Sequence, residues 1–326
     1  MDPAIVAVVL VAALLHVTWN VLLKTAGDPM LAATVGILAA TLVVVPVAVI
    51  GWLGAGRPSV PAEAIALGVV SGLLETGYFV CLSTAYRHGD LSVVYPTARG
   101  TAPMIAVVIG VVVFGERLGV PGAIGVALLL AGLLTLTRPW RLLFGDLQGG
   151  DRAATGYALA TGVLIALYSS VDREGSRLTE PWLYAALIWP AMAIGLVGWR
   201  WLRVAARARV LVPALGAGGS AGGPAGLLAA DASSTDPGPD EAIASIDTRR
   251  AIAGGLITLV AYLLILFAYA QAPLSVVAPL RESAVVVASG WGALRLGEAE
   301  GRQDAARRLL AAALVAAGIA LLVFEG

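Results

Sequence analysis

Charge is scarce in this sequence. Charged residues make up 13% of the 326 positions, against roughly a quarter in an average soluble domain. Hydrophobic residues reach 59%, and the mean hydropathy is +0.89. So little polar surface cannot cover a water-soluble globule of this size, so we expect lipid to surround much of the chain. The formal net charge of zero excludes a basic footprint for nucleic acid.

Cysteine and histidine are nearly absent as well. The single cysteine, Cys81, lies in an apolar run without a partner for a disulfide or a metal site. Two histidines, His16 and His88, are too few for a histidine-ligated metal, so we expect no metal and no cofactor. The glycine-rich stretch 216–223 lacks the Gly-Lys-Ser/Thr ending of a nucleotide-binding loop and is read as linker. An ion or solute gradient would therefore have to supply any energy that the protein uses.

What the sequence has is long apolar runs. A membrane-crossing helix needs about 20 mostly apolar residues, and continuous runs favour helices over the alternating strands of a barrel. Ten such runs predict an all-α membrane protein with ten transmembrane helices, although the uninterrupted apolar part of the last one covers only 309–324. The runs are 4–23, 31–52, 63–84, 91–114, 118–137, 154–172, 182–202, 251–270, 274–296 and 306–324.

One motif occurs twice. The pattern LSVV-x-P stands at Leu91–Pro96 and at Leu274–Pro279, and each copy is preceded by Ala-Tyr and followed by Gly-Glu, at Glu116 and at Glu298. In a membrane protein a duplicated half is the usual plan of a secondary transporter, with the substrate site between the halves.

The repeat divides the chain. We predict a first five-helix repeat at 1–138, a linker at 139–153 and a second five-helix repeat at 154–326, interrupted by a disordered loop at about 212–248. Five is an odd number, so the second half must enter the membrane from the opposite side, which makes the repeats inverted. Fifteen of the 19 basic residues outside the membrane core fall in the odd-numbered loops. That bias predicts cytoplasmic odd loops and external termini.

The first apolar run carries a polar stripe. His16 and Asn20 are four residues apart, so they share one helical face, and Trp19 lies beside them. Polar side chains inside a membrane either line a cavity or bond to a neighbouring helix. We place all three among the candidate substrate-binding residues.

Two charges follow in the third and fourth runs. Glu75, with Tyr78 three residues later, lies in mid-run, and Arg99 follows Tyr95 in the first LSVV-x-P copy. A Glu75–Arg99 ion pair is the simplest way to keep both charges in lipid. Alternatively, Arg99 binds an anionic group of a solute, or Glu75 takes up a coupling proton.

The second copy of the motif carries Arg281 and Glu282, and Glu282 aligns with Arg99, so a pair between the halves is a further possibility. Pro96 and Pro279 fall about one turn into their helices, where each removes a backbone hydrogen bond. They either kink or unwind the helix for gating, or only bend it for packing.

Three further residues come from alignment of the halves. Tyr168 aligns with His16, and Tyr262 aligns with the position after Tyr78, so both join the candidate site. Asp172, next to Arg173, is interpreted as half of an ion pair at the membrane surface. The Gly-Glu endings are interpreted as contacts at helix ends.

Three features of the sequence point to a known family. They are the two five-helix halves, the stretch HVTWNVLLK in the first run, and the pattern AY-x(4)-LSVVYP-x-x-RG-x-x-P followed by GE. Together they resemble the EamA family of the drug/metabolite transporter superfamily. The resemblance implies a ten-helix carrier of the cytoplasmic membrane, with a cavity between the halves and cytoplasmic termini, opposite to the loop charges. The expected function is alternating-access transport, in the direction of efflux, of a small organic metabolite such as an amino acid, nucleoside, sugar or drug-like solute. The proton is a candidate coupling ion, and the protein would be a monomer or a homodimer. A membrane enzyme and a non-transporting scaffold are the alternatives.

Overall fold

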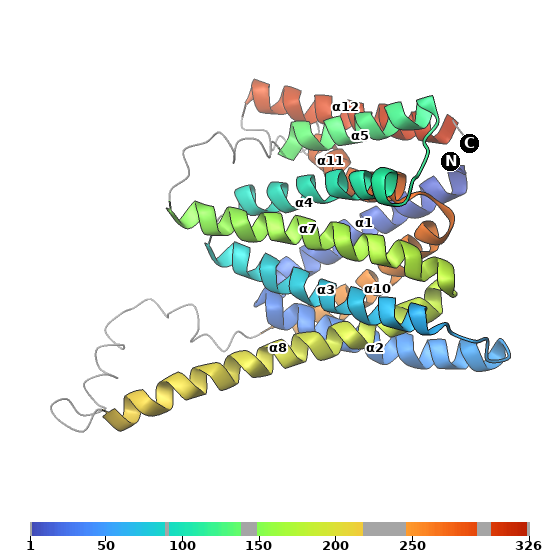
Figure 1. Ribbon diagram of the computed structural model, residues 1–326. Coiled ribbons are helices and arrows are strands. Elements are labelled where there is room, and N and C mark those ends of the chain that lie inside the picture. The colour runs from blue at the N-terminus through green and yellow to red at the C-terminus, as the bar shows by residue number, and fades with distance from the viewer. Residues whose placement is uncertain (1, 89–90, 138–148, 218–245, 292–300, 325–326) are drawn as a thin grey trace.

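The computed structural model describes residues 2–88, 91–137, 149–217, 246–291 and 301–324 (Figure 1). Within these ranges the chain forms ten α-helices and one short π-helix, and no strand. The elements are α1 (Pro3–Thr25), α2 (Pro29–Gly54), α3 (Ala62–His88), α4 (Leu91–Val108), η1 (Ile109–Val113), α5 (Val120–Thr137), α7 (Gly149–Leu178), α8 (Pro181–Ala217), α10 (Thr248–Gln271), α11 (Leu274–Trp291) and α12 (Arg302–Phe324).

Seven of the described helices are long and apolar enough to cross a membrane: α1, α2, α3, α7, α8, α10 and α12. Two shorter apolar stretches, Thr97–Val113 and Val120–Leu136, lie in α4–η1 and α5. The chain is therefore a multi-pass membrane protein. The last span, α12, is longer than the apolar stretch 309–324. Arg307, near its start, donates to the Leu136 carbonyl oxygen at the end of α5 (2.9 Å), so this charged side chain has a polar partner.

Two helix ends differ from the predicted segment boundaries. α7 begins at Gly149, inside the predicted linker 139–153, and α8 continues to Ala217, past the predicted start of the loop at 212. The remainder of that loop, 218–245, lies outside the described residues. Pro96 and Pro279 do not unwind their helices, because α4 and α11 both continue through them.

Contacts at helix ends fix the direction of the helices. Asp247, the N-cap of α10, donates its backbone N–H to Ala26, just after α1 (2.8 Å). At the other end of α10, Arg177 of α7 donates from Nε to the Tyr269 carbonyl oxygen at 3.2 Å. α10 thus runs from the end of α1 to the end of α7, so α1 and α7 run in opposite directions. The face where α1 begins and α7 ends is called the N-terminal face below, and both chain ends lie on it (Figure 1).

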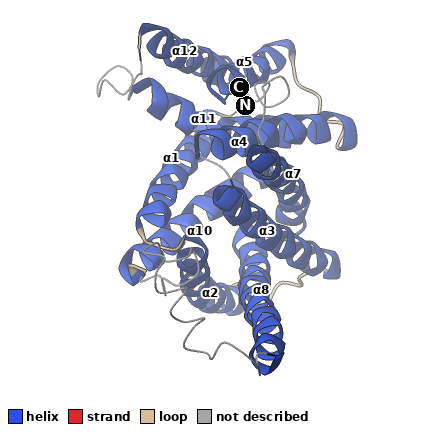
Figure 2. Ribbon diagram, turned by 90° about the vertical axis from the view of Figure 1, so that its left-hand side faces the viewer, coloured by secondary structure: helices blue, strands red, loops and turns tan. Residues whose placement is uncertain are grey.

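The inter-helix contacts come in matched sets. α3 packs on α7 and α1 packs on α10; likewise α3 packs on α8 and α2 on α10, and α4 packs on α7 and α1 on α11. Three further contacts pair α2 with α8, α4 with α11 and α5 with α12. Figure 2 shows the α5–α12 pair at one edge, the α2–α8 pair at the other and the remaining helices between them. The charged residues of the predicted site lie on the helices of this central group.

Glycine permits a close crossing of α2 and α10. A Cβ on Gly255 of α10 would lie 2.1 Å from the carbonyl oxygen of Gly36 in α2. No side chain fits there, so the two backbones touch, as small residues allow between membrane helices.

Candidate functional site

Five charged side chains are buried in the central group of helices. They are Glu75 of α3, Arg99 of α4, Asp172 of α7, and Arg281 and Glu282 of α11, each no more than 7% exposed. A charge at this depth in lipid is costly unless it is partnered. The contacts of these five residues divide them into two clusters.

The first cluster joins the two copies of the repeated motif. Arg99 Nη1 lies 3.0 Å from both carboxylate oxygens of Glu282, and Arg281 Nε lies 3.2 Å from Glu282 Oε1. One carboxylate therefore serves two guanidinium groups, which are charged at every accessible pH. Breaking such a buried pair by removing one partner is strongly destabilising.

His16 of α1 extends this cluster. Its Nε2 lies 3.1 Å from Arg99 Nη2. A guanidinium only donates hydrogen bonds, so Nε2 must accept this one, and the imidazole is neutral with its proton on Nδ1. His16 thus contacts Nη2 of Arg99, whereas Glu282 contacts Nη1.

The second cluster is built around a phenol. The Tyr262 hydroxyl of α10 lies 2.7 Å from Glu75 Oε1 and also contacts Asp172 Oδ2. Ser71 of α3 donates to the other oxygen of Asp172 at 2.5 Å. All four residues are buried, so this acid–phenol–acid arrangement is screened from bulk water. The triad below means Glu75, Tyr262 and Asp172.

Aromatic rings run beside the first cluster, from His16 to Arg281. Edge-on contacts run from His16 to Trp19 (5.5 Å between centroids), Trp19 to Phe79 (6.4 Å), Phe79 to Tyr78 (4.8 Å) and Tyr78 to Tyr168 (6.1 Å). The Arg281 guanidinium then lies 5.9 Å from the centre of the Tyr168 ring, within reach of a cation–π attraction. These rings, called the aromatic wall below, have apolar faces and polar edges.

Most of the predicted site residues thus meet at one place. Asn20 is turned to its own helix instead, and its amide donates to the His16 carbonyl at 2.6 Å. The side chains of Tyr95 and Pro96 lie outside the described residues. Pro279 lies in α11 two positions before Arg281.

The expected Glu75–Arg99 pair was wrong, because Arg99 turns to Glu282 and His16 while Glu75 turns to Tyr262. The interpretation of Asp172 as half of a surface pair was wrong too, since only 1% of it is exposed. A signal was present in the sequence, because Asp172 aligns with Asn20 when the halves are superimposed.

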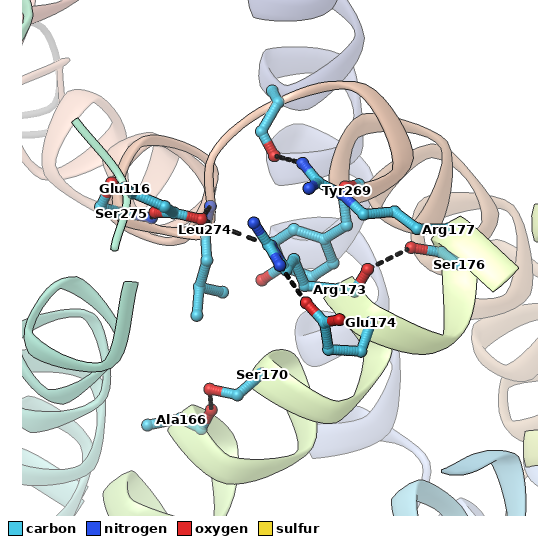
Figure 3. A network of polar contacts seen from close by, with 11 residues as sticks. Glu116, Ala166, Ser170, Arg173, Glu174, Ser176, Arg177, Tyr269, Leu274 and Ser275 are labelled. Carbon is cyan, nitrogen blue, oxygen red and sulfur yellow. Dashed lines mark hydrogen bonds and ion pairs between the residues drawn. The ribbon is translucent and has the colours of Figure 1, made fainter. Parts of the chain in front are cut away.

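A third group of contacts lies at the N-terminal face (Figure 3). The Glu116 carboxylate accepts the backbone N–H groups of Leu274 and Ser275, at 2.8 and 2.9 Å, and so caps the first turn of α11. Arg173 Nε approaches Glu116 Oε1 at 3.4 Å. A carboxylate at a helix N-terminus satisfies free N–H groups and opposes the positive end of the helix dipole. The Gly-Glu ending of the first copy therefore holds the start of the second, which confirms a helix-end contact.

Arg173 and Arg177 make further contacts at the N-terminal face. The Arg173 guanidinium stacks 4.3 Å from the centre of the Phe114 ring, and Arg177 binds the carbonyls at the end of α10. Glu116, Arg173 and Arg177 are called the latch below. Glu298, the equivalent of Glu116 in the second copy, lies outside the described residues.

A small cavity lies toward the opposite face. It holds about 20 Å³ and is lined by residues of α1, α2, α3 and α10, among them Trp19, Phe79 and Thr258. That volume admits one water molecule. Trp19 Nε1 and Thr258 Oγ1 are buried and have no hydrogen-bond partner among the described residues, so the cavity offers a water two polar contacts. Between the described side chains no group of three or more His, Cys, Asp or Glu could hold a metal.

Comparison with known proteins agrees with the sequence resemblance. Residues 3–138 match the EamA-like transporter family. This chain is 32% identical, over 71 residues or 22% of its length, to the multidrug resistance protein EbrB of Bacillus atrophaeus and to that of Bacillus subtilis (strain 168). These matches span 59% of each relative's length. A solved crystal structure covers 100% of this chain and 98% of its own, with a TM-score of 0.61 and 16% identity, which shows a shared fold.

Proposed function

Since residues 3–138 match a family of membrane transporters, we propose that this protein is a secondary transporter that moves a small organic metabolite across the cytoplasmic membrane by alternating access. Its solute site is the Arg99–Glu282–Arg281 cluster with the aromatic wall beside it. The solute classes are those expected from the sequence, namely amino acids, nucleosides, sugars and drug-like compounds. Export is the proposed direction, with the proton as coupling ion.

One observation carries the proposal. Arg99 and Glu282 come from equivalent positions of the duplicated motif and bond to each other across the two halves. A charge pair buried in lipid costs stability compared with an apolar contact of the same size. A solute that competes for either partner would gain a strong charged contact. A role in solute binding would therefore explain why the protein keeps a pair that lowers its stability.

The arrangement of helices supports two inverted repeats of five. α1 and its counterpart α7 run in opposite directions, as shown by the contacts at the two ends of α10. The largest contacts between helices of different halves have counterparts when the halves are exchanged, for example α3 on α7 and α10 on α1. Two halves related in this way can rock about the site between them, which exposes it first to one side and then to the other.

The two faces also differ as alternating access requires. On the N-terminal face the latch ties the ends of α7 and α10 to the start of α11. On the opposite side the small cavity reaches Trp19, one ring contact away from His16. We propose that the described conformation is closed at the latch and that the path toward the site begins near Trp19.

A solute screen tests the proposal. Purified protein in detergent is heated with individual members of the four solute classes, and the melting temperature is recorded. A true ligand binds only the folded state and raises the melting temperature with its concentration. The hit is then tested for uptake and efflux in sealed vesicles. Solute flux that follows the hit's own gradient supports the proposal. A hit that the protein converts chemically, or binds without moving it, would overturn it.

A further inference from the structure

We propose that the triad of Glu75, Tyr262 and Asp172 is the binding site for the coupling proton, apart from the Arg99–Glu282 pair that meets the solute. The inference rests on the proposed transport function and assigns the ion to named residues.

The number of hydrogens in the triad carries the inference. A phenol has one hydroxyl hydrogen, yet the Tyr262 oxygen is within bonding distance of an acid on either side, Glu75 and Asp172. It can donate to only one of them. The other contact is favourable only if that acid carries a proton and donates to the phenol oxygen. The described geometry therefore fits one proton shared by the two acids in addition to the phenol's own.

Removal of that proton changes the contact. The triad then holds two carboxylates and one donor, so one acid faces the phenol oxygen without a hydrogen between them. Two carboxylates that contact the same phenol oxygen repel each other, which is why paired acids in proteins tend to share a proton. The proton would arrive from water on one face and leave to water on the other, with no bond made or broken besides O–H.

The triad also spans the two halves. Glu75 belongs to α3 of the first half, whereas Tyr262 and Asp172 belong to α10 and α7 of the second. Protonation therefore strengthens a contact between halves and deprotonation weakens it. A ligand shifts a conformational equilibrium only by binding one state more tightly than another, and the proton does so here.

Two other acids, Glu282 and Glu116, face cationic or N–H partners. Glu282 faces two guanidinium groups, and Glu116 faces two backbone N–H groups and Arg173. The other charged and titratable groups around the triad are Arg281 of α11, Tyr168 of α7, Tyr184 of α8, Tyr78 of α3 and Tyr269 of α10. Arginine and tyrosine keep one charge state near neutral pH. Among these described groups, the exchange of a proton falls to Glu75 and Asp172.

Infrared spectroscopy tests the assignment without a solute. A protonated carboxylic acid in a dry site has a carbonyl stretch apart from that of a carboxylate. Purified full-length protein is titrated with pH in lipid nanodiscs. We expect one such band that fades as the pH rises, and its loss or displacement in both Glu75→Gln and Asp172→Asn. Glu63→Gln, at an exposed acid in the first turn of the same helix α3, is the matched control and should keep it.

The outcomes separate the two proposals. A titrating band that survives in Glu75→Gln and Asp172→Asn, or no titrating band in wild type, would overturn the proton site and leave the transport proposal intact. Folding of each variant is checked by its melting temperature, and Tyr262→Phe provides an independent variant. It removes the shared hydroxyl while both acids remain, so we expect the band to shift in frequency. An unchanged band in Tyr262→Phe would also contradict the assignment.

Discussion

Arg99 and Glu282 stand at the same position in two copies of one motif, 183 residues apart, and bond to each other through Arg99 Nη1 and both carboxylate oxygens at 3.0 Å. The copies have kept LSVV-x-P at the start of α4 and α11 and have diverged to opposite charge on the facing surface. The interface between the halves is therefore symmetric in backbone and asymmetric in charge. In the proposed solute site, that asymmetry would favour one orientation of the solute.

Removal of the shared carboxylate should destabilise the protein more than removal of one arginine. Glu282→Ala leaves Arg99 and Arg281 facing each other, and breaking a buried pair costs about 3–5 kcal/mol. Arg99→Ala leaves Glu282 paired with Arg281 and should cost less. Melting temperatures in detergent measure both. The double variant Arg99→Glu with Glu282→Arg restores opposite charges and should melt above Arg99→Glu alone. Equal melting of those two would show that the pair contributes no coupling.

Loss of the Glu116 cap should loosen the N-terminal face. Glu116→Ala leaves two N–H groups of α11 without an acceptor and removes the charge that attracts Arg173. A helix cap is worth about 1 kcal/mol, so the open form should gain roughly fivefold. Hydrogen–deuterium exchange of the first turn of α11 measures this, and faster exchange is expected. Glu116→Gln keeps an oxygen acceptor and should fall between. Wild-type exchange rates in Glu116→Ala would disprove the latch.

The crossing of α2 and α10 should tolerate a side chain at one glycine and not at its neighbour. Gly255→Ala would place Cβ 2.1 Å from the Gly36 carbonyl oxygen, whereas the nearest atom to a Cβ on Gly254 is 3.6 Å away. Overpacking costs roughly 1–3 kcal/mol. We expect a lower melting temperature for Gly255→Ala and little change for Gly254→Ala. Two variants of equal stability would mean that the helices do not cross this closely.

The sequence alone identified Arg99 and Glu282 as equivalent positions and Glu116 as a helix-end contact. Both predictions depend on a repeat that can be aligned by eye. The sequence misassigned the partner of Glu75, because a list of apolar runs does not say which helices are neighbours. In the structure α3 packs mainly on α7 and α8, so Glu75 meets Asp172 and Tyr262 rather than Arg99.

Asp172 was misplaced for a related reason. The predicted apolar run stopped at 172, which put this acid at the membrane surface, but α7 continues to Leu178 and carries Asp172 inside the bundle. Helix ends are poorly defined by hydropathy where polar residues such as Arg173 and Arg177 have buried partners. The triad could therefore be found only once α3, α7 and α10 were placed side by side.

Solute flux in reconstituted vesicles tests the central claim most directly. The solute that stabilises the wild-type protein is loaded into proteoliposomes, and its release is followed for wild type, Arg99→Ala and Glu75→Gln, with Glu63→Gln as control. The account predicts rapid release for wild type and the control and at least a tenfold loss for Arg99→Ala. For Glu75→Gln we predict that solute exchange persists while accumulation of the solute driven by a pH gradient is lost. Normal, gradient-driven transport by both Arg99→Ala and Glu75→Gln, in protein that melts like wild type, would contradict it.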